Sequence, residues 1–390
     1  MSSSAPTLAF VESPVQLLNV LEWAYARAAA PGRALDAVPS QRGRRAAGPG
    51  TEPRPRPAGT LAPVRIVVLP PTDPMSRGQL RRMAALARDE GCEVQWQEAR
   101  GSRLAPLKAL AALARDVRAA GTVVVGDPFS RYVQLLLTLV RAEELVVVDD
   151  GTATMEFVAQ TARGERLVRW HRVGGGGLPG RVRELAYAPV SAAARRRFAP
   201  AAAAAGKARR VEVFTSMPVV PHGGMTLRAN EFAWTRARFG PPRLTKGTDL
   251  VGTSLVETGV VDPDRYLDAV RSLTLEHGAT RYFAHRRESP EKLRALSRET
   301  GLEIVRPDLP LELIARRGPV GRTILSFPST VVHTLPYALT GTGVTVAVCD
   351  VDPAWLTGSA SPRAKSFLAG VTDTARDVHR LPAQAAPTAG

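Results

Sequence analysis

Short runs of β-branched residues alternate with longer stretches of helical spacing along most of this chain of 390 residues. Such alternation is typical of parallel sheets whose strands are joined by crossover helices. One series begins with a strand at Thr7–Val11 and a helix at Pro14–Ala29, and a second series begins near Asp249. The sequence therefore predicts an α/β fold of two Rossmann-like domains with a ligand cleft between them.

Domain boundaries follow from where this alternation starts and stops. The later strands are expected at 64–69, 93–96, 122–125, 145–148, 211–214, 250–251, 281–284, 303–305, 323–325 and 344–348, with first-series helices at 77–89, 106–119 and 130–141. We expect an N-terminal domain at 1–30 and 63–215, a connection at 216–248, a C-terminal domain at 249–375 and a tail at 376–390. The Gly174–Gly177 run is interpreted as a flexible connection, because no strand leads into it and no clear helix follows.

The chain is basic, with 52 Lys and Arg against 36 Asp and Glu and a net charge of +16. Part of this excess lies in residues 31–62, whose Arg, Pro, Gly and Ala leave almost nothing to bury, so we expect a disordered insert there. Tight basic clusters occur at Arg195–Arg197 and Lys207–Arg210, where a solvated face is the simplest interpretation. An anionic partner is therefore suggested by the charge but not required by it.

The sequence shows no pattern of a membrane anchor, an export signal or a metal-binding cysteine cluster. No apolar run approaches the length that spans a bilayer, and the first 26 residues lack Lys and Arg. We therefore expect a cytoplasmic protein, with peripheral association at the inner face of the membrane as an alternative. The two cysteines, Cys92 and Cys349, are expected to be buried and inert thiols rather than a disulfide or a zinc site.

Two acids follow the predicted strand at 145–148, where Asp149 and Asp150 precede Gly151. Ligands of open parallel sheets bind at the carboxyl ends of strands, so polar residues there are candidate site residues. Neighbouring carboxylates repel each other, and desolvation in a cleft raises the pKa of at least one of them, as suits a general base. An ordinary turn is the alternative interpretation, because Asp and Gly are common turn residues.

Two further strand ends carry groups suited to binding a phosphate. His285 is followed by Arg286 and Arg287, and both imidazole and guanidinium groups can donate hydrogen bonds to an anion. Ser329 and Thr330 stand where a helix should begin, near free backbone N–H groups and the positive end of the helix dipole. Simple N-capping by these hydroxyls is the alternative, and it is compatible with phosphate contact.

The first strand of the second domain ends at Gly252 and Thr253, where a glycine lets a ligand approach the backbone closely. Taken together, these motifs resemble in kind and order those of the bacterial sialyltransferases and polysialyltransferases, in particular the branch that includes lipooligosaccharide sialyltransferases. The resemblance covers about Thr7 to Asp350, apart from the Arg-rich insert. The segments that carry it are Ser13–Gln16, Asp149–Gly151, Val251–Glu257, His285, Leu309–Leu313 and Ser326–Thr330.

This resemblance implies a GT-B architecture, in which two Rossmann-like domains face each other across a cleft. It implies an inverting transfer of sialic acid or a related nonulosonic acid from a CMP-sugar to a hydroxyl of a glycan or glycolipid acceptor. The implied catalytic residues are Asp149 as general base, with Asp150 beside it, and His285, which contacts the phosphate and acts as general acid. On the donor side, Ser329 and Thr330 would hold the phosphate, Glu312 would bind the ribose, and Gly252 and Thr253 would line the nucleotide pocket. Ser13 and Gln16 would lie in the cleft on the acceptor side.

One departure from the family pattern concerns the motif histidine, which should be followed by Pro and is followed here by Arg286. This Arg adds a charge for phosphate binding and weakens the assignment of His285. No metal and no other cofactor is expected, because hydroxyls, a helix N-terminus and a histidine can neutralise the leaving phosphate.

Other functions stay open from the sequence alone. A transferase of the same fold that uses another nucleotide-sugar would carry the same strand-end motifs. A nucleic-acid-binding protein would explain the net charge of +16, but the basic runs lack interleaved aromatic residues and a recognition helix, so no specific nucleic-acid partner is expected. A glycan-binding descendant without catalysis is the third alternative.

Overall fold

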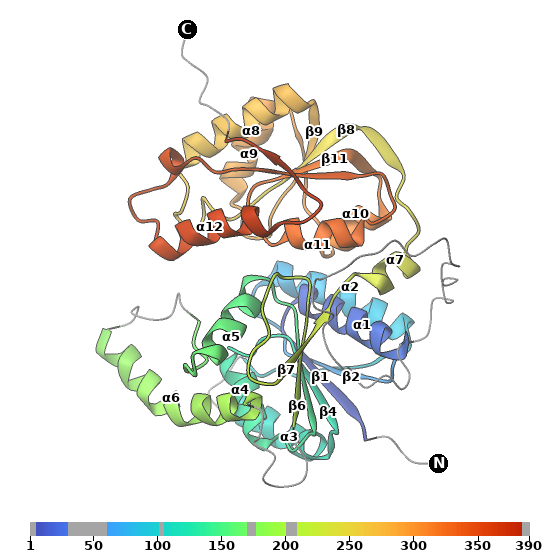
Figure 1. Cartoon of the computed structure of the whole chain (residues 1–390), viewed down its shortest axis with the longest axis vertical. Coiled ribbons are helices and arrows are strands. Elements are labelled where there is room, and N and C mark those ends of the chain that lie inside the picture. Colours follow the sequence, from blue (N-terminus) through green and yellow to red (C-terminus); the bar gives the residue numbers. More distant parts are fainter. Residues whose placement is uncertain (1–4, 30–60, 101–104, 170–176, 200–208, 384–390) are drawn as a thin grey trace, which may run out of the picture. The chain divides into compact units, whose positions relative to one another are not determined.

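The computed structural model describes residues 5–29, 61–100, 105–169, 177–199 and 209–383, without the side chains of residues 177–186, 363 and 367 (Figure 1). The chain divides into two compact units, Met1–Ala237 and Arg238–Gly390. Of the predicted insert at 31–62, only residues 61 and 62 lie within the described residues. Most of the Gly run at 174–177 and the basic Lys207 also fall outside them.

The first unit contains a seven-stranded sheet and the helices that connect its strands. Its elements are β1 (Thr7–Val11), α1 (Pro14–Ala29), β2 (Arg65–Val68), α2 (Pro74–Asp89), β3 (Glu93–Trp96), α3 (Ala105–Ala119), β4 (Thr122–Val125), α4 (Arg131–Leu139), β5 (Glu144–Val148), α5 (Thr152–Ala162), α6 (Gly177–Phe198), β6 (Arg210–Thr215), β7 (Met225–Ala229) and α7 (Ala233–Arg238).

The second unit contains a six-stranded sheet. Its elements are β8 (Leu244–Val251), α8 (Pro263–His277), β9 (Ala279–Phe283), α9 (Pro290–Thr300), β10 (Glu303–Val305), α10 (Leu311–Arg317), β11 (Val320–Ser326), α11 (Val331–Ala338), β12 (Thr345–Cys349), a short 3₁₀ helix (Pro353–Trp355), α12 (Pro362–Thr374) and β13 (His379–Leu381).

Both sheets have the strand order of a Rossmann fold. The orders are β3-β2-β1-β4-β5-β6-β7 and β10-β9-β8-β11-β12-β13, and all described strand pairs are parallel. Each order reverses once, between β1 and β4 in the first sheet and between β8 and β11 in the second. The prediction of two Rossmann-like α/β domains is confirmed, and the two reversal points are the places where such sheets bind ligands.

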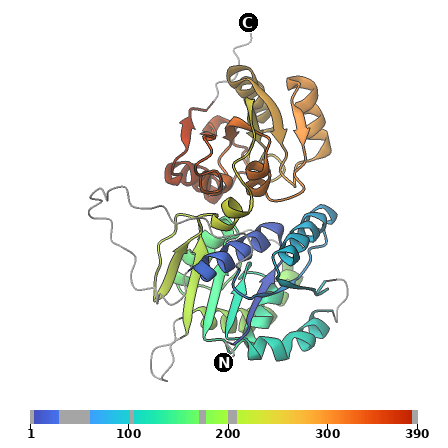
Figure 2. The ribbon, with the colours of Figure 1, turned by 90° about the vertical axis from the view of Figure 1, so that its right-hand side faces the viewer.

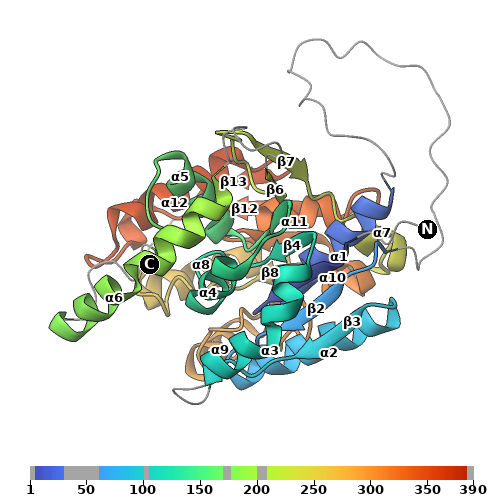
Figure 3. The same cartoon turned by 90° about the horizontal axis from the view of Figure 1, so that it is seen from below.

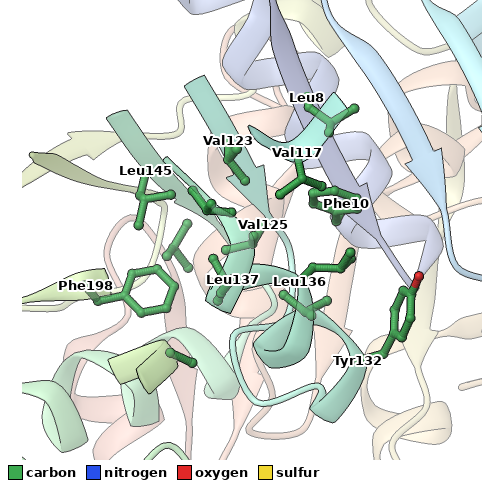
Figure 4. Packing of buried hydrophobic residues seen from close by; sticks show 14 of the residues in the cluster. Leu8, Phe10, Val117, Val123, Val125, Tyr132, Leu136, Leu137, Leu145 and Phe198 are labelled. Atoms are coloured by element: carbon green, nitrogen blue, oxygen red, sulfur yellow. The ribbon is translucent and has the colours of Figure 1, made fainter. Parts of the chain in front are cut away.

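The first sheet is covered on both faces, which explains its Val-rich strands. Every residue of β4 and β5 is buried, as expected for central strands of a parallel sheet. Figure 4 shows side chains such as Val123, Val125 and Leu145 packed together with Leu136 and Leu137 of α4. Helices α4 and α6 lie side by side on this face (Figures 1 and 3), whereas α1 and α2 cover the other face (Figure 2).

Several described helices begin where the sequence supplies a cap, in most cases together with a proline. Asp or Ser side chains accept a backbone N–H of the first turn in α2, α4, α8, α9 and α12, and Pro stands in the first turn of all of these except α4. The N-cap oxygen satisfies a free N–H group, and the fixed φ of proline suits the first helical position. None of the described helices is long and apolar enough to serve as a membrane span.

The structure extends both domains beyond their predicted limits. The predicted connection at 216–248 contains β7, α7 and the start of β8, and the first unit ends at Ala237 rather than at residue 215. The predicted tail contains β13, which pairs with β12. Both β7 and β13 are edge strands, β7 partly and β13 largely exposed, so they lack the apolar run by which strands are found in a sequence. A helix, α6, does begin at Gly177, contrary to our expectation.

Candidate functional site

Asp149 directly follows β5 at the carboxyl edge of the first sheet and is 2% exposed. Ser216, which follows the neighbouring strand β6, donates to Asp149 Oδ2 through its backbone N–H and its hydroxyl, both at 3.2 Å. The other carboxylate oxygen, Oδ1, is buried and has no hydrogen-bond partner among the described residues. Burial raises the pKa of Asp149, and the surrounding hydroxyls offset this rise only in part. This group therefore holds a proton more readily than an ordinary Asp.

Asp150 differs from its neighbour because it has a cationic partner. Arg169 Nη2 lies 3.0 Å from Asp150 Oδ2 and 2.9 Å from Asp127 Oδ2, so one guanidinium bridges the ends of β4 and β5. Two adjacent acids thus differ: Asp150 is paired with Arg169, whereas Asp149 is buried and has no cationic partner among the described residues.

A second ion pair stands at the end of β1. Arg100 Nη2 lies 2.8 Å from Glu12 Oε2, and the hydroxyl of Ser130 donates to Glu12 Oε1 at 2.6 Å. Burial raises the pKa of Glu12, and Arg100 opposes that rise. The carboxyl edge of the first unit is therefore a row of partly buried acids held by two arginines.

Ser13 and Gln16, the other predicted residues of this edge, are used in local structure. The Ser13 hydroxyl accepts the backbone N–H of Gln16 at 3.2 Å and so caps α1. Gln16 is 2% exposed, and its Oε1 accepts the N–H of Glu12 at 2.7 Å. A Cβ added at Gly126 would lie only 2.4 Å from this Oε1 atom, so the glutamine fills the space beside the end of β4.

In the second unit, predicted site residues lie on both sides of the reversal point. Gly252 and Thr253 follow β8, and Ser329 and Thr330 follow its sheet neighbour β11. Thr330 begins α11 but its hydroxyl makes no capping hydrogen bond, which contradicts the capping alternative for this residue. Within the described part of the chain, the Ser329 hydroxyl has one hydrogen-bond contact, with Ser326 Oγ at 3.3 Å. These hydroxyls and the first N–H groups of α11 therefore share one end of the sheet.

His285 follows β9, the other sheet neighbour of β8. Its Nδ1 accepts the backbone N–H of Arg287 at 3.2 Å, which assigns the imidazole proton to Nε2. Burial, reinforced by Arg286, Arg287 and Lys292, lowers the pKa of His285 to about 4. At neutral pH the ring is therefore uncharged and can donate one hydrogen bond through Nε2.

A buried ion pair that was not predicted lies behind this histidine. Glu288 is 3% exposed and accepts the backbone N–H of His285 at 2.6 Å and the hydroxyl of Tyr282 at 2.6 Å. Lys292 Nζ lies 2.8 Å from Glu288 Oε1 and donates to the carbonyl oxygen of Thr253 at 3.1 Å. This pair connects the segments that follow β8 and β9.

Glu312 and Arg286 complete the predicted set. Glu312 lies in the first turn of α10, is 5% exposed, and accepts the hydroxyl of Thr334 on α11 at 2.6 Å. Arg286 is exposed in the turn after β9. The structure therefore brings Gly252, Thr253, His285, Ser329 and Thr330 to adjacent strand ends, and it places Glu312 against the helix that Thr330 begins.

Sequence reasoning missed the charged partners of these groups. Glu12 directly follows strand β1, and Asp127 lies two residues after strand β4. The rule that selected Asp149, a polar residue at the end of a buried strand, would therefore have selected them too. No comparable signal marks Arg100, Arg169 or Lys292, which come from loops or a helix. Among the described residues, no cluster of three or more His, Cys, Asp or Glu side chains is placed to hold a metal ion.

Comparisons with known proteins give no family for this chain, since no family model and no curated protein matches it. A solved α/β-galactoside α-2,3-sialyltransferase from Photobacterium phosphoreum is similar at a TM-score of 0.48 and 7% identity, over 97% of this chain and 99% of that one. An E. coli heptosyltransferase is similar at a TM-score of 0.40 and 10% identity, over 96% of this chain and 92% of that one. The MurG protein of Acinetobacter baumannii is similar at a TM-score of 0.38 and 10% identity, over 97% of this chain and 86% of that one.

Proposed function

We propose that this protein is a glycosyltransferase that moves sialic acid or a related nonulosonic acid from a CMP-sugar to a hydroxyl of a glycan or glycolipid, with inversion and without a metal ion. The nucleotide would bind at the reversal point of the second sheet. The acceptor would bind at the carboxyl edge of the first sheet. The proposal requires that these two edges meet during the reaction.

The observation that carries this proposal is the division of chemistry between the two sheet edges. The first edge holds Asp149, a buried carboxylate with a raised pKa and one oxygen that has no hydrogen-bond partner among the described residues. The second edge holds Ser329, Thr330 and a neutral His285 at neighbouring strand ends. A base for an incoming hydroxyl and donors for a leaving phosphate are the two requirements of transfer from a nucleotide-sugar.

The reaction would use these groups as follows. The bond between the anomeric carbon and the phosphate oxygen breaks, and the acceptor oxygen bonds to the opposite face of that carbon through an oxocarbenium-like transition state. Asp149 takes the proton of the acceptor hydroxyl. The Nε2–H of His285, the hydroxyls of Ser329 and Thr330 and the N–H groups of α11 stabilise the negative charge on the leaving phosphate. A histidine with a lowered pKa acts here as a hydrogen-bond donor rather than as a cation.

Calorimetric titration with CMP, UMP and GDP tests the nucleotide. We expect CMP to bind at least about tenfold more tightly than the other two, a difference of about 1.4 kcal/mol. Tighter binding of UMP or GDP would favour the alternative of a transferase for another nucleotide-sugar. Binding of none of them would contradict both.

Incubation with CMP-sialic acid and a panel of glycan and glycolipid acceptors tests the transfer. Mass spectrometry of the acceptor and CMP release without acceptor separate transfer from hydrolysis, and a parallel reaction with EDTA tests the independence from metal. CMP binding without turnover on any acceptor would favour the catalytically silent glycan-binding alternative.

A further inference from the structure

The carboxylate of Glu288 is among the most heavily bonded acids described in the second unit, although the proposed reaction gives it no direct role. Its side chain is 0% exposed, and three donors converge on it: His285 N at 2.6 Å, Tyr282 Oη at 2.6 Å and Lys292 Nζ at 2.8 Å. A buried carboxylate is stable only when it is paired and hydrogen-bonded. Burial nevertheless raises the pKa of Glu288 despite these donors.

The partner cation also has several fixed contacts. Lys292 Nζ donates to the carbonyl oxygen of Thr253 at 3.1 Å, lies 3.5 Å from Glu257 Oε2 and stands 4.0 Å from the centroid of the Tyr266 ring. Thr253 follows β8 and His285 follows β9, so the Glu288–Lys292 pair ties together two candidate phosphate-binding segments of neighbouring strands. A buried ion pair is a weak source of stability, and geometry is the best-attested reason for keeping one.

Position 252 is occupied by a glycine because the Glu288 carboxylate fills the space that a side chain would need. A Cβ added at Gly252 would lie 2.2 Å from Glu288 Oε2 and 2.7 Å from the hydroxyl of Tyr282. The sequence suggested that this glycine lets a ligand approach the backbone, but the structure shows that it makes room for Glu288. The glycine, the glutamate and the tyrosine are therefore one packed group beneath the end of β8.

The turn after β9 fixes the orientation of the imidazole. The N–H of Glu288 donates to the carbonyl oxygen of His285 at 3.0 Å, and the side chain of Glu288 accepts the N–H of His285 in return. Within this turn Arg287 N donates to His285 Nδ1 at 3.2 Å. The ring nitrogen that can donate to a ligand is then Nε2, and it can do so only while this turn keeps its shape.

We propose that Glu288 is a positioning residue that holds the turn after β9, so that His285 presents the Nε2–H tautomer to the leaving phosphate. The relevance to catalysis rests on the proposed function, but the effect on the imidazole does not. Lys292 anchors the carboxylate, and the groups that face His285 are Arg286 and Arg287 on its own turn, Glu288 at the end of that turn and Lys292 on α9.

The first test reads the tautomer of His285 in the free protein by long-range ¹H–¹⁵N correlation spectra, with the signal assigned from His285→Asn. Wild type should show the neutral Nε2–H form at pH 7. Glu288→Gln should show a mixture of tautomers, because an amide cannot accept the His285 N–H and bond Lys292 and Tyr282 as the carboxylate does. Glu291→Gln is the matched control, since Glu291 lies on the same helix with a side chain that is 75% exposed. An unchanged tautomer in Glu288→Gln would overturn the proposal.

The second test separates positioning from charge balance. Glu288→Gln should lower kcat for transfer by roughly 10–100-fold with a smaller change in KM, as is typical when a residue that orients a reacting group is lost. The double variant Glu288→Gln/Lys292→Met removes both charges and should stay as slow as Glu288→Gln alone. Recovery of the wild-type rate and tautomer in the double variant would show that Glu288 only neutralises Lys292, and would overturn the proposal.

Two further readouts keep the outcomes distinct. Should Glu288→Gln fail to fold, Tyr282→Phe removes one of the three donors without touching the His285 N–H, and a smaller shift in the same direction is expected. A shifted tautomer in a protein that never transfers sugar would support the positioning role and contradict the proposed function. Normal transfer with an unshifted tautomer in Glu288→Gln would contradict the positioning role and support the proposed function.

Discussion

The two units share one strand order but use their reversal points differently. In the first unit, Gln16 fills the space beside Gly126, and Glu12 accepts the hydroxyl of Ser130 across the gap between β1 and β4. In the second unit, Thr330 leaves its hydroxyl out of helix capping, and Ser329 has one long contact at 3.3 Å. The same topology thus gives one reversal point closed by its own side chains and one with polar groups available to a ligand. This difference supports our proposal that the nucleotide binds in the second unit.

The two units also differ in which of their buried groups have shifted pKa values. Burial raises the pKa of several carboxyl groups of the first unit, namely Glu12, Glu22, Asp149 and Glu212. In the second unit burial lowers the pKa of His285 and His333, and Glu288 is the described acid with a raised pKa. The first unit is therefore suited to accepting a proton and the second to donating hydrogen bonds.

The largest predicted effect separates proton transfer from nucleotide binding. Asp149→Asn should lower the transfer rate by about 10²–10⁴-fold, because it removes the proposed general base, while the Kd for CMP stays within about twofold of wild type. An Asn oxygen can still accept the bonds from Ser216, so the fold should persist. Activity and calorimetry on the same preparation check this, with Glu165→Gln, a half-exposed acid of the same unit, as control. A variant that transfers at the wild-type rate would remove the first unit from the chemistry.

Glu22 gives the first unit a pH dependence of stability. It is 1% exposed, accepts the N–H groups of Trp234 and Thr235 at the start of α7, and burial raises its pKa from 4.5 to about 7. A raised pKa means that the folded state binds the proton more tightly, so the stabilisation is complete below pH 4.5 and is lost as pH rises through 7. The loss should be about 3 kcal/mol in the first unit, and Glu22→Gln should remove it.

His285 should give the second unit a pH dependence of stability of the opposite sign. Its pKa falls from 6.5 in the unfolded chain to about 4, so its contribution is present above pH 6.5 and is lost as pH falls through 4. Hydrogen exchange on peptides of each unit, corrected for the intrinsic rate at each pH, follows the two trends separately. Comparison with Glu22→Gln and His285→Asn isolates each group. Parallel trends in the two units would contradict the electrostatic contrast.

Much of this contrast could be predicted from the sequence, because strand ends are visible in it. Asp149, His285 and Ser329 each follow a buried strand, and a parallel sheet brings such ends to one edge. Strand β5 is mostly an apolar run and β9 ends in Tyr282 and Phe283, so the limits of these two strands were predicted to within a few residues. The edge strands β7 and β13 carry no such run and were missed, whereas the edge strands β3 and β10 were predicted.

The partners of these residues could not be predicted, because they depend on packing between segments far apart in the chain. Glu288 and Lys292 look in the sequence like an ordinary exposed pair four residues apart, but the structure buries both against Tyr282 and Tyr266. Gln16 looks like a polar residue available to a ligand, but it fills the space beside Gly126. Spacing along a chain identifies which groups reach an edge, and only the fold shows which of them are already bonded.

Gly252→Ala should destabilise the second unit by about 1–3 kcal/mol, the usual effect of adding a methyl group to a packed interior. The new Cβ would lie 2.2 Å from Glu288 Oε2, and the three donors to the two oxygens of this carboxylate prevent it from moving freely. Gly78→Ala in α2 is the matched control in the first unit, because a Cβ there meets nothing within 4 Å. It should stabilise the protein by about 0.5–1 kcal/mol through helix propensity. Unfolding in urea measures both, and equal effects would show that Gly252 has no special packing role.

The smallest predicted effect compares Ser13, which follows β1 of the first sheet, with Ser329, which follows β11 of the second sheet. Ser329→Ala should raise the Kd for CMP about five- to tenfold, which corresponds to one lost hydrogen bond of about 1 kcal/mol, and should leave stability unchanged because its contact with Ser326 is long. Ser13→Ala should do the opposite: it removes the cap of α1 and destabilises by about 0.5–2 kcal/mol, with no change in CMP affinity. Calorimetry and urea unfolding on both variants give a crossed pattern if only the second reversal point receives the nucleotide. A loss of CMP affinity in Ser13→Ala alone would move the nucleotide to the first unit and reverse the assignment of the two edges.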